Sequence, residues 1–132
     1  MKIDFARALG KTLEGHALGL MGLMQICFHR PESGHEAATA EEAIERLRLG
    51  LKLEIREGTA SKDLSKILRG LVHQRVSLRN CLLCSDDLET RDILKGHMDL
   101  LLAKAVEVGV DPVEAMRMAT VNVAEHFRLG TF

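Results

Sequence analysis

Residues 51–57 constrain the fold more strongly than any other part of this sequence. Hydrophobic and charged residues alternate along the segment, so that Leu51, Leu53 and Ile55 share one face. The opposite face is charged. This period of two predicts a β-strand that buries one face and exposes the other.

Amphipathic helices are expected on both sides of this strand. Thr39 and Glu42 form a capping box, which predicts a helix that begins there and ends at Gly50. After the strand, Ser61 can cap a second helix whose apolar residues recur at helical spacing. These apolar residues are Leu64, Ile67, Leu68 and Leu71. A strand between two such helices is typical of parallel βα units.

The rest of the chain continues this alternation. Further strand-like runs end at His16, at His35 and at Asp86. Helices are expected at residues 2–9, 18–28, 90–108, from residue 111 onwards and again over 123–129. We therefore expect an α/β protein with about four parallel strands and extra C-terminal helices. Four such strands form either a small open sheet or half of a closed eight-stranded barrel.

Composition excludes several classes of function. The 132 residues are 46% hydrophobic and 28% charged, as in a globular protein, and the formal net charge is -1. Basic and acidic residues are mixed throughout the sequence, so neither nucleic acid nor an anionic membrane surface is expected as a partner. The apolar run at residues 18–28 is shorter than a membrane span of roughly 18 residues, and residues 1–7 resemble a helix start. We expect a cytoplasmic protein with reduced cysteines.

Cys81 and Cys84 have the spacing found in some zinc and redox sites. Residues three apart in a strand lie on opposite faces, so these two sulfur atoms would point away from each other. Two small buried side chains are therefore the preferred interpretation.

Three of the predicted strands end at side chains that can bind a metal ion. His16, His35 and Asp86 would meet at one edge of the sheet, because parallel strands place their carboxyl ends together. Hydrolases that activate a water molecule assemble their metal ligands in this way. Glu36 could carry a proton or simply favour the start of a helix. Arg56 could contact a substrate, but a solvated ion pair is the default expectation.

Several short motifs occur in an order that resembles one enzyme family. They are Glu14-Gly15-His16-Ala17, Gly34-His35-Glu36, Ile55-Arg56-Glu57-Gly58-Thr59-Ala60, Ser85-Asp86-Asp87, Gly96-His97-Met98-Asp99 and Gly109-Val110-Asp111-Pro112. Together they resemble the adenine deaminases of the amidohydrolase superfamily, over nearly the whole chain. The resemblance implies a metal-dependent hydrolase of purine metabolism that converts adenine and water into hypoxanthine and ammonia.

The resemblance also implies a fold and a set of site residues. Residues 1–132 would form the second half of a (β/α)8 TIM-type barrel, with strands like the fifth to the eighth and the helices that follow. His16, His35 and Asp86 would bind a divalent metal, Mn, Fe or Zn, and Asp86 would also take the proton of the attacking water. Glu36 would be a second proton-transfer residue.

This sequence departs from the family pattern at several points, among them Leu18, where the family tends to have proline, and the apolar run that follows it. A further histidine pair and a bridging carboxylate of the family are expected before Met1, so we expect the isolated chain to be weakly active or inactive. In addition, no aspartate precedes His35, which leaves the orientation of this histidine unexplained.

A second hypothesis gives the chain no catalytic role. In that case it is a truncated half-barrel that acts as an oligomeric scaffold or binding module and buries its sheet edges against another copy. The expected partner is then a second copy of the chain, whereas the enzyme hypothesis requires a purine substrate and an N-terminal barrel half.

Overall fold

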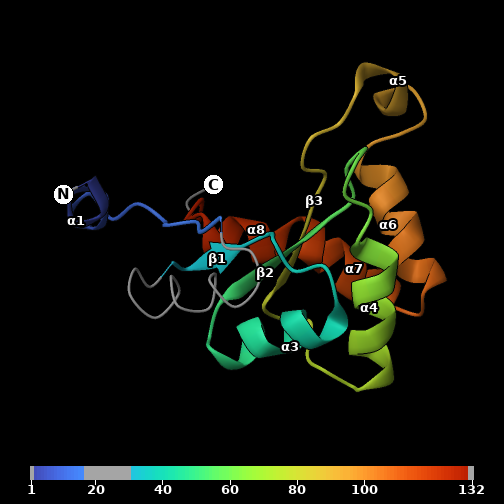
Figure 1. Ribbon diagram of the computed structural model, residues 1–132, viewed down its shortest axis with the longest axis horizontal. Helices are drawn as coiled ribbons and strands as arrows, with labels where there is room; N and C mark the ends of the chain where they lie inside the picture. The colour runs from blue at the N-terminus through green and yellow to red at the C-terminus, as the bar shows by residue number, and fades with distance from the viewer. Residues whose placement is uncertain (1, 17–30, 131–132) are drawn as a thin grey trace.

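A computed structural model describes residues 2–16 and 31–130 of the chain. Its sheet has three parallel strands, β1 (Ser33–Gly34), β2 (Lys52–Arg56) and β3 (Cys81–Cys84), which follow one another in that order (Figure 1). Strands β2 and β3 pair from Leu53 opposite Cys81 to Arg56 opposite Cys84. The expected α/β class with parallel strands is confirmed.

The first of the four expected strands is reduced to a single bridge. Glu14 pairs with Ser33 in the parallel sense, and the backbone N–H of Gly15 donates to the Ser33 carbonyl at 3.0 Å. Residues 12–16 therefore lie beside β1 without forming a regular strand, and the prediction of a fourth strand is wrong. Gly15 offers a reason, because glycine has no side chain to pack and weakens a strand.

Helices precede, separate and follow these strands. In the described residues they are α1 (Lys2–Ala8), α3 (Ala40–Arg48), α4 (Leu64–His73), α5 (Thr90–Ile93), α6 (Met98–Glu107), α7 (Pro112–Ala119) and α8 (Val121–His126). The apolar helix expected at residues 18–28 lies outside the described residues. No helix in the described part of the chain has the length and hydrophobicity needed to cross a bilayer.

Two helix starts follow the capping signals in the sequence. The Thr39 hydroxyl accepts from the N–H of Glu42 at 3.2 Å, while the Glu42 carboxylate accepts from the N–H of Ala38 at 2.9 Å. At the start of α7, the Asp111 carboxylate accepts from two backbone N–H groups, with Pro112 in the first turn. Both predicted starts are confirmed.

Two other helix predictions need correction. Helix α4 begins at Leu64 after Asp63 rather than at a Ser61 cap, and the Asp63 side chain makes no capping hydrogen bond. The single helix expected over residues 90–108 is divided into α5 and α6. Gly96 lies between them with φ of +139°, a conformation that other residues adopt at a large cost and that a continuous helix excludes. The expected helix end at Gly109 is confirmed: α6 ends at Glu107, and Gly109 has a φ of +100°.

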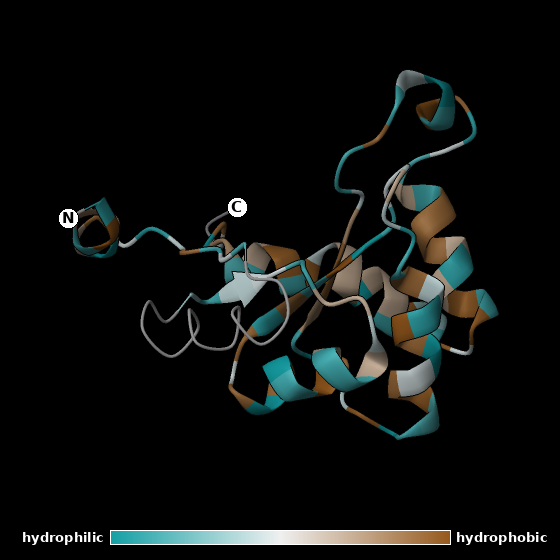
Figure 2. Ribbon diagram, in the orientation of Figure 1, coloured by the Kyte–Doolittle hydropathy of each residue, from teal (hydrophilic) through white to brown (hydrophobic). Residues whose placement is uncertain are grey.

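The hydrophobic core lies between one face of the sheet and the helices. Leu53 and Ile55 of β2 are fully buried there, as the alternation in the sequence predicts. The helices α3, α4, α6 and α7 cover this face with the residues Ala43, Ile44, Leu64, Ile67, Leu68, Leu71, Leu101, Ala105, Ala115 and Met118. Hydrophobic and hydrophilic residues occur together on α4 and α6, as expected of helices that bury one side (Figure 2).

The two strand cysteines lie in surroundings that disfavour the thiolate form. Cys81 belongs to the hydrophobic core, and Cys84 is partly buried outside it, which agrees with their expected placement on opposite faces. Burial raises the pKa of both thiols to about 12. Because thiolates are the reactive and metal-binding form, this environment supports the interpretation of two small buried side chains.

Candidate metal centre

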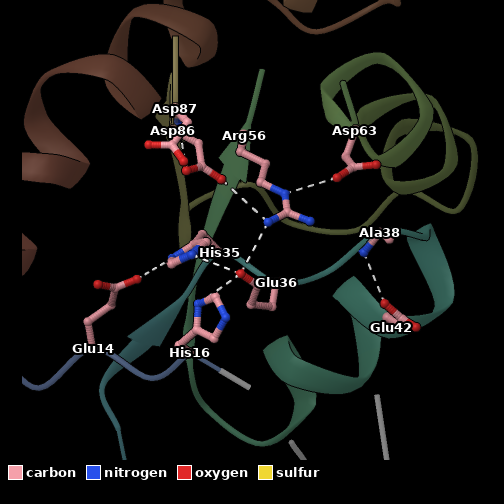
Figure 3. Close-up of polar contacts among 10 residues, drawn as sticks. All are labelled: Glu14, His16, His35, Glu36, Ala38, Glu42, Arg56, Asp63, Asp86 and Asp87. Atoms are coloured by element: carbon pink, nitrogen blue, oxygen red, sulfur yellow. Dashed lines mark hydrogen bonds and ion pairs between the residues drawn. The ribbon is translucent and has the colours of Figure 1, made fainter. Parts of the chain in front are cut away.

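Polar side chains gather where the parallel strands end. His16 follows the bridge at Glu14, His35 and Glu36 follow β1, and Arg56 is the last residue of β2. Figure 3 shows these side chains pointing toward one another, with Asp86 approaching from the end of β3. Parallel pairing brings them together, because it places all strand ends at the same edge of the sheet.

The centre of this group is the carboxylate of Glu36. Its Oε1 atom lies 3.0 Å from Nδ1 of His16 and 3.0 Å from Nε2 of His35. Donor atoms of the three residues lie within 4.8 Å of one another. Two imidazole nitrogens and a carboxylate oxygen are a donor set that zinc, manganese and iron accept, so these residues fit a divalent metal ion.

Solvent exposure differs sharply between the three residues. The side chain of Glu36 is 5% exposed and that of His35 21%, whereas His16 is 72% exposed. The site therefore has a buried wall formed by Glu36 and His35 and an open side at His16.

Arg56 links the buried carboxylate to two others. Its Nε–H donates to Asp63 at 3.0 Å, and its Nη1 lies 3.2 Å from Glu36 and 3.4 Å from Asp86. The side chain is 11% exposed, so the expectation of a solvated ion pair is wrong. Burial alone would lower the pKa of Arg56, but the hydrogen bond to Asp63 and the charges of Glu36 and Asp86 raise it.

Asp86 joins the site through Arg56 and not through the histidines. It is absent from the described groups of residues whose donor atoms lie within 4.8 Å of one another. Its backbone has a φ of +58°, and its Oδ1 accepts from the N–H of Asp87 at 2.8 Å. Asp86 rather than Asp87 faces the site, as its contact with Arg56 shows.

A glycine allows the loop of Asp86 to approach β2. A Cβ atom on Gly58 would lie 2.7 Å from the carbonyl oxygen of Asp87 and 2.8 Å from that of Ser85. Such distances are too short for any side chain, so glycine permits the loops after β2 and β3 to touch. This contact holds Asp86 within reach of Arg56.

Glu14 is the site residue that the sequence did not indicate. Its carboxylate makes a short contact with Nδ1 of His35. Glu14 also forms a second possible ligand group with His35 and Glu54, again within 4.8 Å. Its position two residues before His16 could have indicated Glu14 as a site residue, because alternate residues of an extended segment share a face.

A buried polar pair lies on the face of β2 that is opposite the hydrophobic core. Nε2 of His126, which belongs to α8, is 4.0 Å from Oε1 of Glu54, and neither atom has a hydrogen-bond partner among the described residues. Burial lowers the pKa of His126 and raises that of Glu54, so each group is shifted toward its neutral form. His126 is thus a buried residue of α8, while His97 directly precedes α6.

Comparison with known proteins identifies relatives of the chain. Adenine deaminase from Desulforamulus reducens is 39% identical over 134 aligned residues that cover 99% of this chain. Adenine deaminase from Methanothrix thermoacetophila is 41% identical over 130 residues, or 97% of the chain. The chain is homologous to a segment of the adenine deaminases. Adenine deaminase from Methanococcoides burtonii is 47% identical over 95 residues, or 72% of the chain.

The homologous segment is a small part of these adenine deaminases. The chain spans 23% of the length of the first two relatives and 16% of the third. No family model matches the chain. The resemblance to adenine deaminases that the ordered motifs indicate is thus confirmed for a segment of that enzyme.

Proposed function

We propose that this chain forms the metal-binding segment of an adenine deaminase, which hydrolyses adenine to hypoxanthine and ammonia. The convergence of His16, His35 and Glu36 at one strand edge carries this proposal. Homology to adenine deaminases supplies the substrate class, a purine base. The cofactor is a divalent metal, Mn, Fe or Zn, each of which accepts imidazole and carboxylate donors.

We propose further that residues 1–132 are one partial (β/α)8 barrel segment. The strands follow one another across the sheet in chain order and all run parallel. Consecutive strands of a closed barrel have this arrangement, whereas a doubly wound sheet reverses its order at a switch point. The bridge at Glu14 and the three strands β1 to β3 then correspond to the fifth to eighth barrel strands.

Each site residue has a separate role in this proposal. His16, His35 and Glu36 present the three donor atoms to the metal. Asp86, which the resemblance implies as a ligand, contacts Arg56 instead. A bound divalent metal lowers the pKa of a coordinated water toward neutrality. Asp86 takes the proton of the attacking water and passes it to the purine. Arg56 holds the carboxylates of Glu36 and Asp86 in place, because it contacts both.

An alternative function follows from the open edge of the sheet. Within the described residues, β3 has a neighbour on one side alone, so its other edge is available for pairing. The chain could then be a non-catalytic scaffold whose partner is a second copy. In the enzyme proposal, the other half of an adenine deaminase barrel pairs with this edge instead.

Ammonia release from adenine distinguishes the two functions. The purified chain, supplied with Mn²⁺, Fe²⁺ or Zn²⁺, is expected to release ammonia and hypoxanthine slowly, because the described residues form one side of a site. The variant His35→Ala should release neither product, since it lacks a proposed ligand. His73→Ala, which alters an exposed histidine on α4, is the control and should match the wild type. A wild-type chain that binds none of these metals, releases no ammonia and associates with itself would support the scaffold and contradict the enzyme.

A further inference from the structure

Helix α5 and the residues around it form a segment that the hydrophobic core does not hold. None of the residues of α5 is buried, and its neighbours Ile93 and Leu94 are 51% and 86% exposed. Figure 1 shows α5 standing apart from the other helices. The segment begins close to Asp86, the proposed base, which lies two residues after the end of β3. The position of Asp86 therefore depends on contacts other than apolar packing.

Thr59, in the loop after β2, bonds to three residues of this segment. Its hydroxyl group accepts from the backbone N–H of Glu89 at 2.9 Å and donates to Oδ2 of Asp92 at 2.8 Å. Its backbone N–H donates to the carbonyl oxygen of Asp87 at 2.9 Å. A hydroxyl group has one donor and two acceptor positions, so both of its contacts form together. A single residue thus links the loop after β2 to the whole segment after β3.

The direction of each of these hydrogen bonds is determined. A backbone N–H can only donate, so the hydroxyl accepts from Glu89 and keeps its own proton for Asp92. Hydrogen bonds from Lys95 and Thr59 lower the pKa of Asp92, so this carboxyl group is ionised at neutral pH. The bond from Thr59 to Asp92 is therefore charge-assisted, which makes it stronger than a bond between two neutral groups.

Asp86 needs support because its backbone is in the left-handed region. Its φ of +58° costs free energy in residues other than glycine. The next residue, Asp87, is the one whose carbonyl oxygen accepts from Thr59. The N–H of Asp87 donates to Oδ1 of Asp86 at 2.8 Å, while Oδ2 of Asp86 lies 3.4 Å from Nη1 of Arg56. Thr59 therefore acts on the residue that orients the Asp86 carboxylate.

We propose that Thr59 is a positioning residue, which holds the segment after β3 so that the carboxylate of Asp86 stays beside Arg56. A small displacement of a catalytic group can lower a reaction rate about 100-fold. The catalytic consequence rests on the proposed function, in which Asp86 takes a proton from the attacking water. The placement of the segment does not, because it depends on the hydrogen bonds of Thr59 alone.

Limited trypsin digestion of the full chain tests this placement. Trypsin cleaves after lysine and arginine, and the segment contains Arg91 and Lys95. Thr59→Val keeps the shape of the side chain but removes both hydrogen bonds of the hydroxyl group, so cleavage at these sites should be about 10-fold faster than in the wild type. Thr59→Ser keeps a hydroxyl group and should restore slow cleavage. Ser61→Ala, which removes another hydroxyl group from the same loop, is the control.

Ammonia release and zinc affinity of the same proteins test the positioning role. For adenine, kcat should be about 10- to 100-fold lower in Thr59→Val than in the wild type, with KM unchanged, and Thr59→Ser should recover most of it. Zinc affinity should stay the same in both variants, because the three proposed ligands come from other segments of the chain. General unfolding would instead lower zinc binding and ammonia release together.

Unchanged cleavage after Arg91 and Lys95, or an unchanged kcat, in folded Thr59→Val would overturn the proposal. If the valine variant does not fold, Asp92→Ala gives the same test, because it removes one partner of the hydroxyl group and leaves Thr59 in place. A wild-type chain that releases no ammonia would contradict the proposed function instead. The trypsin comparison would then decide by itself whether Thr59 holds the segment.

Discussion

Arg56→Met is expected to lower the free energy of unfolding by about 3 to 5 kcal/mol, the cost of removing one partner from a buried ion pair. Methionine keeps much of the length of the side chain but has no charge. Glu36, Asp63 and Asp86 would then lose their shared cation, and Glu36 is 5% exposed. Chemical denaturation at pH 7 measures this change.

The same substitution at an exposed position provides the control for Arg56. Arg117 pairs with Glu114 at 3.7 Å, and both side chains are more than 40% exposed. Arg117→Met should cost about 0 to 1 kcal/mol, as expected for a surface pair. The effect at Arg56 should also shrink at acidic pH, because a protonated carboxyl group needs no counter-charge. A cost below about 1 kcal/mol at both positions would contradict the role of Arg56 as the shared cation.

Leu53→Ala is expected to lower the free energy of unfolding by about 2 to 5 kcal/mol, because it removes buried methyl groups and leaves a cavity. Leu53 is fully buried in the middle strand of the sheet, between β1 and β3. Thermal and urea denaturation both measure this loss. Leu94→Ala is the matched control, because Leu94 is 86% exposed, and its effect should stay within about 0.5 kcal/mol. Equal effects at the two positions would contradict the assigned core.

Local sequence patterns predict the regular part of this fold well. The alternation around Leu53 and the capping residues Thr39 and Asp111 involve neighbours in the chain, and each pattern corresponds to an observed element. The strand predicted near His16 is not formed, because the segment around Gly15 pairs with β1 through a single bridge. The single helix predicted over residues 90–108 is not formed, because the positive φ of Gly96 separates α5 from α6.

The site could be predicted in part, because strand ends can be located from sequence but side-chain contacts cannot. The meeting of His16, His35 and Glu36 follows from parallel pairing. Arg56 was expected in solvent, since its partners Glu36 and Asp86 lie 20 and 30 residues away in the sequence. Such distant partners leave no pattern in a single sequence.

The orientation of His35 shows the same limit. The sequence contains no aspartate before this histidine, and no local residue accounts for its orientation. The fold provides Glu14 instead, 21 residues earlier, from the neighbouring extended segment. Pairing between neighbouring segments therefore determines the environment of the histidine.

Metal titration of the full chain by calorimetry tests the assignment of the metal centre most directly. We expect Zn²⁺ to bind at about one ion per chain, through His16, His35 and Glu36. His16→Ala, His35→Ala and Glu36→Ala should each weaken binding strongly, while His73→Ala on α4 should bind as the wild type does. Zinc binding that is absent from the folded wild type, or unaffected by all three substitutions, would contradict a metal centre at this edge of the sheet.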